Sequence, residues 1–513
     1  MLRLCLVVVV MFVPLATGAE VPDKPQPLIR VSKETTFIVE PLDADGYVNY
    51  TEALNRAEAK GVTVENNFEI VVRELLGPAE IPETFRAEYY RRLGIKDLPT
   101  APALFRTFSE FFTTTDADEM SQVAAEEGII QSRPWSTKDF PRGEKWLKAM
   151  GPLLDRLVEG TKRPRYYLPY ASETGTTGIA RVSFAVSNIT DQRQLMNGLM
   201  RRGYSRVGAG DVEAAWQDAQ AVRRQAGLMC QRALLIDRTI GMFMDYRAVD
   251  LEIAILRSGK LSPGGCRQYL KALQGQPPLP TCMDTYRWGE RLYVLDMIQC
   301  FARGGGKEWE LVDYGVERTE PLAECDQIDW SRTLELMNAG LDQFVKIYSE
   351  PDPVRRRQME MDAKQSAEED VAFFKKTDSW KNVVLQGTPR ERGEQFAKLL
   401  RGSAASSIFE PYRGDYRYSA RRALLLIEYA LELHKLERGE YPKALDALVP
   451  MYLKTIPLDP DSGRLPIYRL GGSFGFKLYC VGRNGQDNDG KVPEGVDPPE
   501  DDIVLERPPA NVP

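Results

Sequence analysis

Helical periodicity in the middle of the chain most constrains its fold. Apolar residues recur at three- and four-residue spacing in three consecutive segments, Asp191–Val207, Val212–Arg232 and Leu234–Leu256, as in amphipathic helices. Between the first two segments, Gly208-Ala209-Gly210-Asp211 supplies a glycine to end one helix and an aspartate to cap the next. These features predict a mainly α-helical protein.

The same periodicity predicts further helices on both sides of this region. They are Tyr50–Lys60, Asn67–Leu76, Thr84–Arg92, Leu104–Phe112, Leu261–Leu273, Thr285–Phe301, Trp330–Tyr348, Pro353–Lys376, Pro389–Leu400 and Ser419–Arg438. Gly203, Ala215 and Ala219 make the central hairpin similar to one tetratricopeptide unit. Because further copies at a fixed period are not found, we expect a single such hairpin within an irregular helical domain.

Length and charge limit the architecture and the partners. The chain has 513 residues, which is long for a single hydrophobic core. After a leader we expect an N-terminal mostly helical region (20–135), an α-helical domain (136–410) and a C-terminal α+β domain (411–513). The net charge of −7 leaves no domain-wide basic excess, which argues against a nucleic-acid partner.

The first residues have the composition of an export signal. Arg3 is followed by the apolar run Leu4–Ala16, which is too short to span a bilayer, and by the small residues Thr17-Gly18-Ala19. We therefore expect a signal peptide over residues 1–19 and a periplasmic or extracellular protein with no transmembrane segment after cleavage. The alternative is an uncleaved membrane anchor.

Histidine and cysteine usage restricts the chemistry. His434 is the single histidine, so a catalytic triad or a histidine-rich metal site would depend on one imidazole that the pattern places on a helix surface. In an oxidising compartment the cysteines predict either one or two disulfides or buried free thiols, with the pairing left open. The cysteines beyond the leader are Cys230, Cys266, Cys282, Cys300, Cys325 and Cys480.

An early segment partly matches the calcium-binding loop of an EF-hand. Within Pro41–Glu52, four residues with oxygen ligands fall at liganding positions, whereas Pro41 stands where an aspartate is expected. Those four residues are Asp43, Asp45, Asn49 and Glu52. The alternative is an Asp-x-Asp-Gly turn followed by a helix, and the sequence leaves metal binding here open.

A second minor motif interleaves basic and aromatic side chains over Lys162–Tyr167, extended by Tyr170. Such a cluster can hold an anion, a sugar or a peptide, or it can pack on the preceding helix Gly143–Glu159 with its charges in solvent. Among 74 acidic residues, no pair is singled out for glycoside hydrolysis. Glycine-rich phosphate loops are absent from the sequence.

The last hundred residues combine a helix, two strands and an acidic loop. The helix Ser419–Arg438 ends at Gly439, and the predicted strands are Leu465–Leu470 and Phe474–Val481. The loop Gly482–Gly490 follows. Aspartates gathered there without a cation would repel one another, whereas calcium accepts six to eight oxygen ligands in irregular geometry. The sequence therefore predicts a calcium site, with a disordered acidic tail as the alternative.

Several short motifs of this region occur together in one known family. They are Gly439-x-Tyr441-Pro442, Leu445-x-x-Leu448-Val449, Asp459-Pro460 with Gly463, Tyr479-Cys480-Val481-Gly482-x-Asn484-Gly485, and Asp501-Asp502-Ile503. In these the region resembles the C-terminal globular domain of the major pseudopilin of bacterial type II secretion systems. The resemblance implies a helix packed on a small antiparallel sheet and one structural calcium ion. The implied ligands are Asn484, Asp487, Asp489, Asp501 and Asp502.

Two departures from the pseudopilins concern the rest of the chain. The family's N-terminal processing site and long apolar helix are missing, so assembly into a pseudopilus is not expected. The remainder, with Trp135, Trp146 and the basic and aromatic run, is similar to uncharacterised exported bacterial proteins. We expect an interaction or scaffold protein of the cell envelope, with protein partners, rather than an enzyme. The alternatives are a secreted hydrolase with paired carboxylates in the helical region and a component that docks onto secretion machinery.

Overall fold

The computed structural model describes residues 27–78, 81, 83–96, 104–170, 183–303, 327–375, 384–471, 475–482, 485–490 and 502–505. The expected signal peptide, Cys325 and the ligand candidates Asn484 and Asp501 lie outside these residues. The N-terminal helices are α1 (Tyr50–Glu58), α2 (Phe68–Leu76), α3 (Glu83–Leu93), α4 (Phe108–Phe111), α5 (Ala117–Ile130) and α6 (Pro141–Gly160).

The middle of the chain forms α7 (Ser183–Ala209), α8 (Val212–Met229), α9 (Leu235–Arg257), α10 (Pro263–Gly275), α11 (Cys282–Arg287) and α12 (Gly289–Ala302). The last part forms α13 (Trp330–Tyr348), α14 (Pro353–Lys375), α16 (Pro389–Arg438), the 3₁₀ helix η4 (Leu445–Leu448), β1 (Ile467–Leu470), β2 (Phe476–Cys480) and β3 (Ile503–Val504). The prediction of a mainly helical protein is confirmed. Within the described residues, no helix has the length and apolarity to cross a bilayer.

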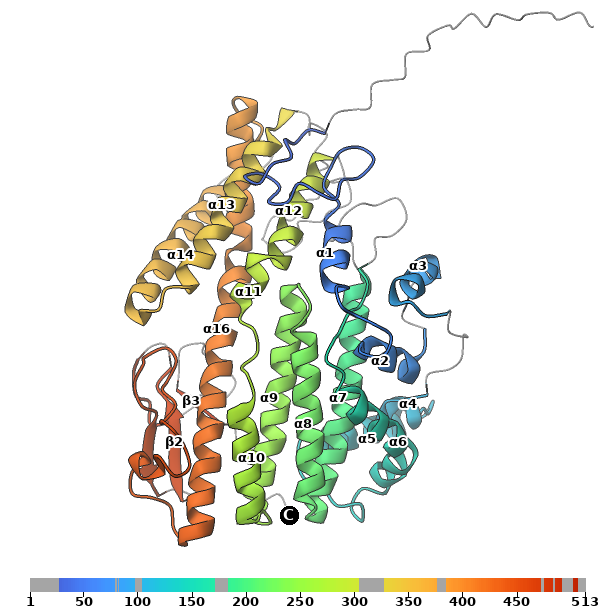
Figure 1. Ribbon diagram of the computed structural model, residues 1–513, viewed down its shortest axis with the longest axis vertical. Coiled ribbons are helices and arrows are strands. Elements are labelled where there is room, and N and C mark those ends of the chain that lie inside the picture. The colour runs from blue at the N-terminus through green and yellow to red at the C-terminus, as the bar shows by residue number, and fades with distance from the viewer. Residues whose placement is uncertain are drawn as a thin grey trace, which may run out of the picture.

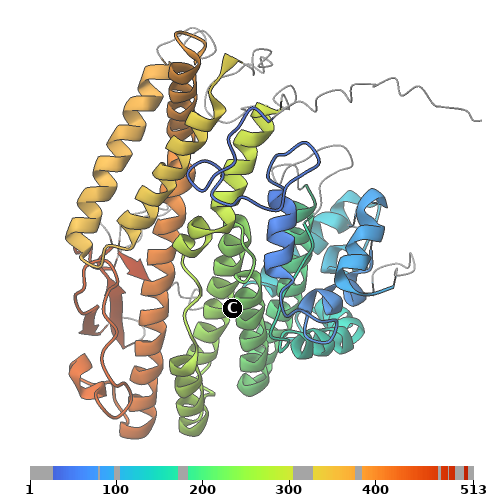
Figure 2. The same ribbon diagram turned by 45° about the horizontal axis from the view of Figure 1, so that its top comes forward.

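Long helices set the frame of the molecule. Helices α7, α8 and α9 contact one another, and α16 lies along α9 and α10 (Figure 1). The helices α1 to α6 cover one flank of this frame, whereas α13, α14 and the sheet lie on the other flank in both views (Figure 2). The molecule is therefore built as a row of helices with smaller elements at either side.

The α7–α8 hairpin forms where the sequence predicts it. Helix α7 ends at Ala209, Gly210 takes a φ of +82°, and the side chain of Asp211 accepts a hydrogen bond from the Ala214 N–H at 3.1 Å. A positive φ suits glycine because it has no Cβ, and the aspartate satisfies an N–H that the first turn leaves without a partner. Local residue chemistry therefore explains the break between the two helices.

Helix α16 is a single element of 50 residues, and the prediction of two separate helices over 389–400 and 419–438 is wrong in this respect. Thr388 and Glu391 form a capping box at its start, and Gly439, with a φ of +86°, ends it. At 1.5 Å per residue such a helix is about 75 Å long. The predicted domain boundary at 410/411 falls inside this helix, and the predicted division into domains stays a prediction.

Two large hydrophobic cores lie along α16. One core joins α2, α6 to α10, the C-terminal half of α16 and the sheet, and it includes Leu424 and Leu431 of α16. The other joins residues 29–93 to α12, α13 and the N-terminal half of α16, and it includes Phe396 and Leu400. Because one helix contributes to both cores, the two ends of the molecule are mechanically connected.

Buried ion pairs join the central helices. On α8 and α9, Arg223 contacts Asp245 and Glu252 at 3.1 and 2.7 Å, and all three side chains are almost fully buried. On α7 and α8, Arg202 reaches Asp218 at 2.6 Å. Breaking such a pair from one side leaves an uncompensated buried charge, which typically costs about 3–5 kcal/mol. These pairs therefore favour one alignment of the helices over its alternatives.

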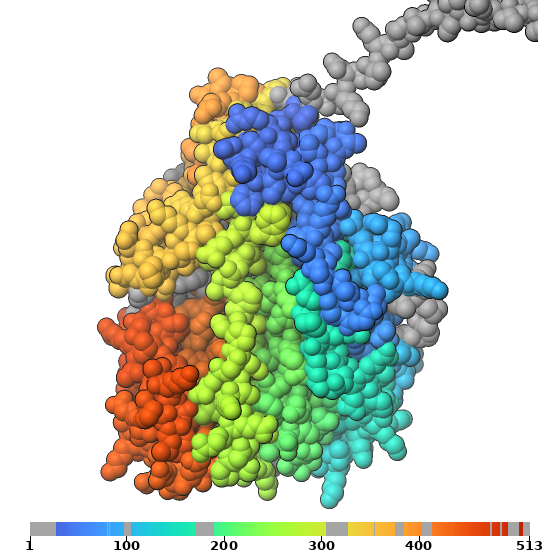
Figure 3. Space-filling view, in the orientation of Figure 1, coloured from blue at the N-terminus to red at the C-terminus, as the bar shows by residue number. Residues whose placement is uncertain are grey.

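The C-terminal sheet is antiparallel with the order β1-β2-β3. Its register pairs Arg469 with Lys477 and Cys480 with Ile503. The two predicted strands are confirmed, each with slightly shorter bounds. The sheet contacts α16, and the C-terminal segments around it lie at one lower edge of the molecule (Figure 3).

Candidate functional site

The acidic loop brings two of the predicted ligands around one basic side chain. The guanidinium group of Arg469 on β1 donates to Asp487 Oδ2 at 2.8 Å and to Asp489 Oδ1 at 2.7 Å. Lys477 Nζ on β2 lies 2.8 Å from the other oxygen of Asp489. Since Arg469 and Lys477 face each other across the sheet, these carboxylates also neutralise two like charges that would otherwise repel.

Asp502 occupies a different place in the same loop. Its side chain is buried at the start of β3, and Oδ2 accepts hydrogen bonds from the N–H groups of Asn488 at 3.0 Å and Gly490 at 2.7 Å. Asp489 and Gly490 have φ values of +61° and +68°. The chain therefore turns back in the left-handed region at this point, and the two N–H groups point to the Asp502 carboxylate.

Hydrogen bonds keep Asp487 ionised. Its Oδ1 accepts from the N–H of Asp489 at 2.9 Å and from the Tyr479 hydroxyl at 2.8 Å. These hydrogen bonds, followed by the charge of Arg469, lower the pKa of Asp487 below its ordinary value. The side chain is thus an acceptor across the physiological pH range, which is the form a cation requires.

In the described part of the loop, Asp487 and Asp489 are paired with the basic side chains of Arg469 and Lys477. Among the described residues, no three His, Cys, Asp or Glu side chains lie close enough together to hold a metal ion. Asp487, Asp489 and Asp502 nevertheless belong to one loop and supply only oxygen donors, which is the donor type that calcium prefers. The oxygen donors of these three residues therefore suit calcium, and Arg469 and Lys477 compete with the ion for Asp487 and Asp489.

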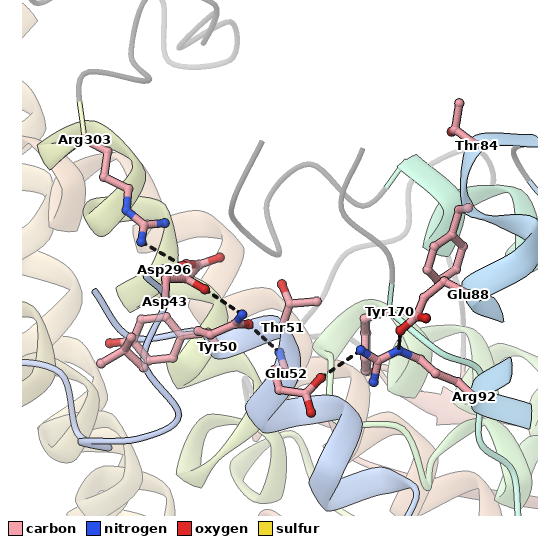
Figure 4. A pocket seen from close by; sticks show the side chains of 13 residues that line it. Asp43, Tyr50, Thr51, Glu52, Thr84, Glu88, Arg92, Tyr170, Asp296 and Arg303 are labelled. Carbon is pink, nitrogen blue, oxygen red and sulfur yellow. Dashed lines mark hydrogen bonds and ion pairs between the residues drawn. The ribbon is translucent and has the colours of Figure 1, made fainter. Parts of the chain in front are cut away.

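A second candidate site is a pocket between α1, α3 and α12 (Figure 4). Its volume is about 280 Å³. One wall is a chain of hydrogen bonds and ion pairs. It begins with Arg303, which contacts Asp43 at 2.8 Å, and Asn49 donates to the same carboxylate at 2.7 Å. The Glu52 N–H donates to Asn49 at 2.7 Å, the Glu52 carboxylate contacts Arg92 at 2.8 Å, and Arg92 contacts Glu88 at 2.7 Å. Residues distant in sequence thus form one continuous polar surface.

The segment that partly matches an EF-hand builds part of this wall. Leu42 bridges Val48 in a short hairpin, Gly46 has a φ of +85°, and α1 follows directly. Asp43 and Asp45 both contact Arg303. The interpretation as an Asp-x-Asp-Gly turn followed by a helix is therefore confirmed as the local structure.

The basic and aromatic run also reaches the pocket. Tyr166, Tyr167 and Tyr170 are buried, and Arg163 donates to the backbone carbonyls of Val64 and Asn67. The run therefore packs between the N-terminal helices. Tyr170 alone among these side chains is part of the lining of the pocket, within the described residues.

The described cysteines are free thiols, which is one of the two alternatives that the sequence left open. They are Cys230, Cys266, Cys282, Cys300 and Cys480, and all five are buried. Burial raises the pKa of Cys230 and of Cys266 to about 12, so neither is a nucleophile at neutral pH. His434 is on the surface of α16, where its Nδ1–H donates to the Glu440 carbonyl at 2.8 Å.

Comparison with known proteins yields no match to a family model, a curated protein or a solved structure. The two sites are therefore interpreted from their own chemistry. Sequence reasoning missed Arg469 and Lys477, whose facing positions depend on strand register. It also missed Arg92 and Arg303 as partners of the early acids, since these contacts join residues 40 and 260 positions apart.

Proposed function

We propose that this protein is an exported interaction or scaffold protein of the cell envelope, with a structural calcium ion in a pseudopilin-like C-terminal module. The observation that carries the proposal is the convergence of Asp487 and Asp489 on the single guanidinium group of Arg469. Two carboxylates that both contact one cationic group can also share one divalent cation.

Calcium can displace the basic partners because their contacts are weak. Arg469, Lys477, Asp487 and Asp489 are all 38–50 % exposed, and an exposed ion pair contributes only about 0–1 kcal/mol. An extracellular calcium module typically has a dissociation constant of about 10⁻⁴–10⁻³ M. At ten times that constant the bound ion adds about 1.4 kcal/mol to the free energy of unfolding.

Asp487, Asp489 and Asp502 would hold the ion, with Asn484 and Asp501 as the further ligands that the family resemblance implies. Calcium would supply positive charge that closes the loop, and it would perform no chemical step. The buried Asp502 is tied to the backbone of the loop, so it would transmit the closure to β3. The proposed role is therefore structural order at the exposed end of the module.

A scaffold role is supported by the way the module is attached. Helix α16 runs without interruption from the α13–α14 helices into the sheet, so the module is a rigid extension of the helical body. The α7–α8 hairpin, which resembles a tetratricopeptide unit, would add a second helical surface of the kind that binds partners. Docking onto secretion machinery through the module is the alternative, and its support is the pseudopilin resemblance.

The hydrolase alternative requires a carboxyl group that donates a proton. Burial raises the pKa of Glu52, but hydrogen bonds from Arg92 and Arg56 outweigh burial and lower the pKa overall. Hydrogen bonds from Arg91 lower the pKa of Glu88 in the same way. Both pocket glutamates are therefore suited to accept hydrogen bonds rather than to act as general acids.

Thermal unfolding with calcium, with magnesium and with a chelator tests the calcium proposal. We expect calcium alone to raise the melting temperature of the wild-type protein, and Asp487→Ala/Asp489→Ala to abolish that rise. The double variant Glu440→Ala/Asp446→Ala removes the same charge from exposed positions of the module and serves as the control. An equal response of the two double variants would contradict the proposal.

The scaffold proposal has its own test. Cell fractionation should recover the protein in the periplasm or the medium, and cross-linking there should join it to secretion or envelope components. Turnover of any substrate in a glycan and peptide panel by the purified protein would contradict the scaffold role without affecting the calcium site.

A further inference from the structure

We propose that the pocket between α1, α3 and α12 binds a neutral, polyhydroxylated ligand, namely a saccharide unit. The proposal is independent of the calcium site, because the pocket belongs to the other hydrophobic core. Its volume of about 280 Å³ is just below the range for small-molecule sites, which is about 300–1,000 Å³. A small ligand of one or two sugar rings suits that size.

Charge balance in the wall selects a neutral ligand. Four of the five carboxylates in and beside the wall are paired with four guanidinium groups, and the fifth, Asp296, is buried and accepts a hydrogen bond from Gln299 at 3.4 Å. Asp43 and Asp45 share Arg303, whereas Glu52 and Glu88 are paired with Arg56, Arg91 and Arg92. A charged ligand would have to compete with these pairs. Hydroxyl groups can instead add hydrogen bonds to them without disrupting the balance.

The wall offers acceptors and donors in alternation. Along it lie the Asp43 carboxylate, the Glu52 carboxylate and the Arg92 guanidinium group (Figure 4), and hydrogen bonds place the Asn49 amide between the first two. Each carboxylate oxygen has two lone pairs and each guanidinium group has five N–H donors, so the groups retain hydrogen-bonding capacity beyond the pairs described. Vicinal hydroxyls, each of which is both donor and acceptor, match such an alternating surface.

Thr51 supplies a hydroxyl group for the ligand. Its side chain lines the pocket, and its Oγ1 is buried without a hydrogen-bond partner within the part of the chain that the structure describes. A buried hydroxyl without a partner is uncommon because its desolvation is not compensated. Figure 4 shows it beside the polar wall, where a ligand hydroxyl can satisfy it.

Aromatic surface completes the lining. Phe85 of α3 and Tyr170 contribute to the pocket, and both rings are buried in the second core. Apolar surface of this kind can cover the C–H face of a sugar ring while the polar wall binds its hydroxyls. Two sequence motifs that are distant from each other, the acidic turn at 43–52 and the aromatic run that ends at Tyr170, meet at this one place.

Calorimetric titration of the full chain with maltose, cellobiose and N,N′-diacetylchitobiose tests the proposal, with glucosamine and glucuronate as charged comparisons. We expect at least one neutral disaccharide to bind and the charged sugars to bind more weakly. Failure of all three neutral disaccharides to bind at millimolar concentration would overturn the proposal, and so would preferred binding of a charged sugar.

Substitutions at Thr51 locate the site. Thr51→Val removes the hydroxyl without loss of a hydrogen bond among the described residues, so we expect a folded variant with about fivefold weaker binding, as for one neutral hydrogen bond. Thr51→Ser retains the hydroxyl and should bind like the wild type. Thr115→Val at an exposed position is the matched control. Equal affinity of Thr51→Val and the wild type would refute the assignment.

Glu88→Gln gives a second readout that does not depend on Thr51. Glu88 is 37 % exposed, so its substitution is compatible with folding, and circular dichroism checks that the helical content is unchanged. The substitution replaces one carboxylate oxygen by an amide donor and frees Arg91, whereas Arg92 keeps its contact with Glu52. We expect weaker binding of the neutral disaccharide and stronger binding of glucuronate. No change in either affinity would place the ligand elsewhere.

Discussion

Replacement of Arg469 and Lys477 by glutamine should strengthen calcium binding, because both side chains compete with the ion for Asp487 and Asp489. The double variant loses three exposed ion pairs, each of which contributes about 0–1 kcal/mol. It also loses the repulsion between two cations that face each other across β1 and β2. These effects oppose each other, so the free energy of unfolding without calcium should change by no more than about 1 kcal/mol.

The effect on calcium affinity follows from Coulomb's law. A divalent ion and a displaced monovalent group roughly 8 Å apart repel by about 1 kcal/mol in water, and salt screens about half of this. Removal of both basic groups should therefore favour calcium by about 1 kcal/mol, or about fivefold in affinity. At a calcium concentration ten times the wild-type dissociation constant, the stabilisation should rise from about 1.4 to about 2.3 kcal/mol.

Urea unfolding at fixed ionic strength, with and without calcium, measures both quantities. Arg267→Gln/Lys271→Gln is the matched control, since it removes two positive charges and one exposed ion pair away from the loop. Unchanged or weaker calcium binding in Arg469→Gln/Lys477→Gln would refute the reasoning. It would mean that the basic side chains hold the loop in its binding form rather than compete with the ion.

Three further predictions concern the helical body. Gly208→Ala places a Cβ against the Trp135 carbonyl oxygen and should lower the free energy of unfolding by about 1–3 kcal/mol in urea. At Gly227 a Cβ meets no atom of the described residues within 4 Å outside its own helix, so Gly227→Ala should not be destabilising. Equal effects would contradict the close approach. Burial raises the pKa of Glu290 from 4.5 to about 7 while Oε2 accepts from the Leu235 N–H. Its contribution to stability is therefore present below pH 4.5 and is lost as pH rises through about 7, so Glu290→Gln should flatten the pH dependence of stability in this window. The five described cysteines should resist alkylation by iodoacetamide in the native protein and react after unfolding, as followed by mass spectrometry; rapid native labelling of any of them would contradict their burial.

Much of the local structure follows from residues that are neighbours in sequence. Gly210 and Asp211 mark the α7–α8 turn, and Gly439 marks the end of α16, as their residue types predict. These signals are reliable because a cap or a positive φ depends on the few atoms of one turn. The alternating strands before and after Gly471 are confirmed for the same reason.

The continuity of α16 depends instead on its neighbours in space. Gly402 and Gly414 lie between the two helices that the sequence predicts, and a Cβ on the first would approach Val371 of α14 at 3.1 Å whereas one on the second would approach Met242 of α9 at 2.6 Å. Glycine at these positions permits close helix packing. Burial along both cores then outweighs the lower helix propensity of glycine, which is about 1 kcal/mol per residue.

The sequence alone determined the helical character and the main turns, because composition and short-range spacing carry that information, whereas the acids that it offers to a cation stay a prediction. Only the tertiary structure decided which charges meet. The contacts of Arg469 with Asp487 and of Arg303 with Asp43 join residues 18 and 260 positions apart. Electrostatic interaction depends on distance in space, and for residues so far apart along the chain the fold sets that distance.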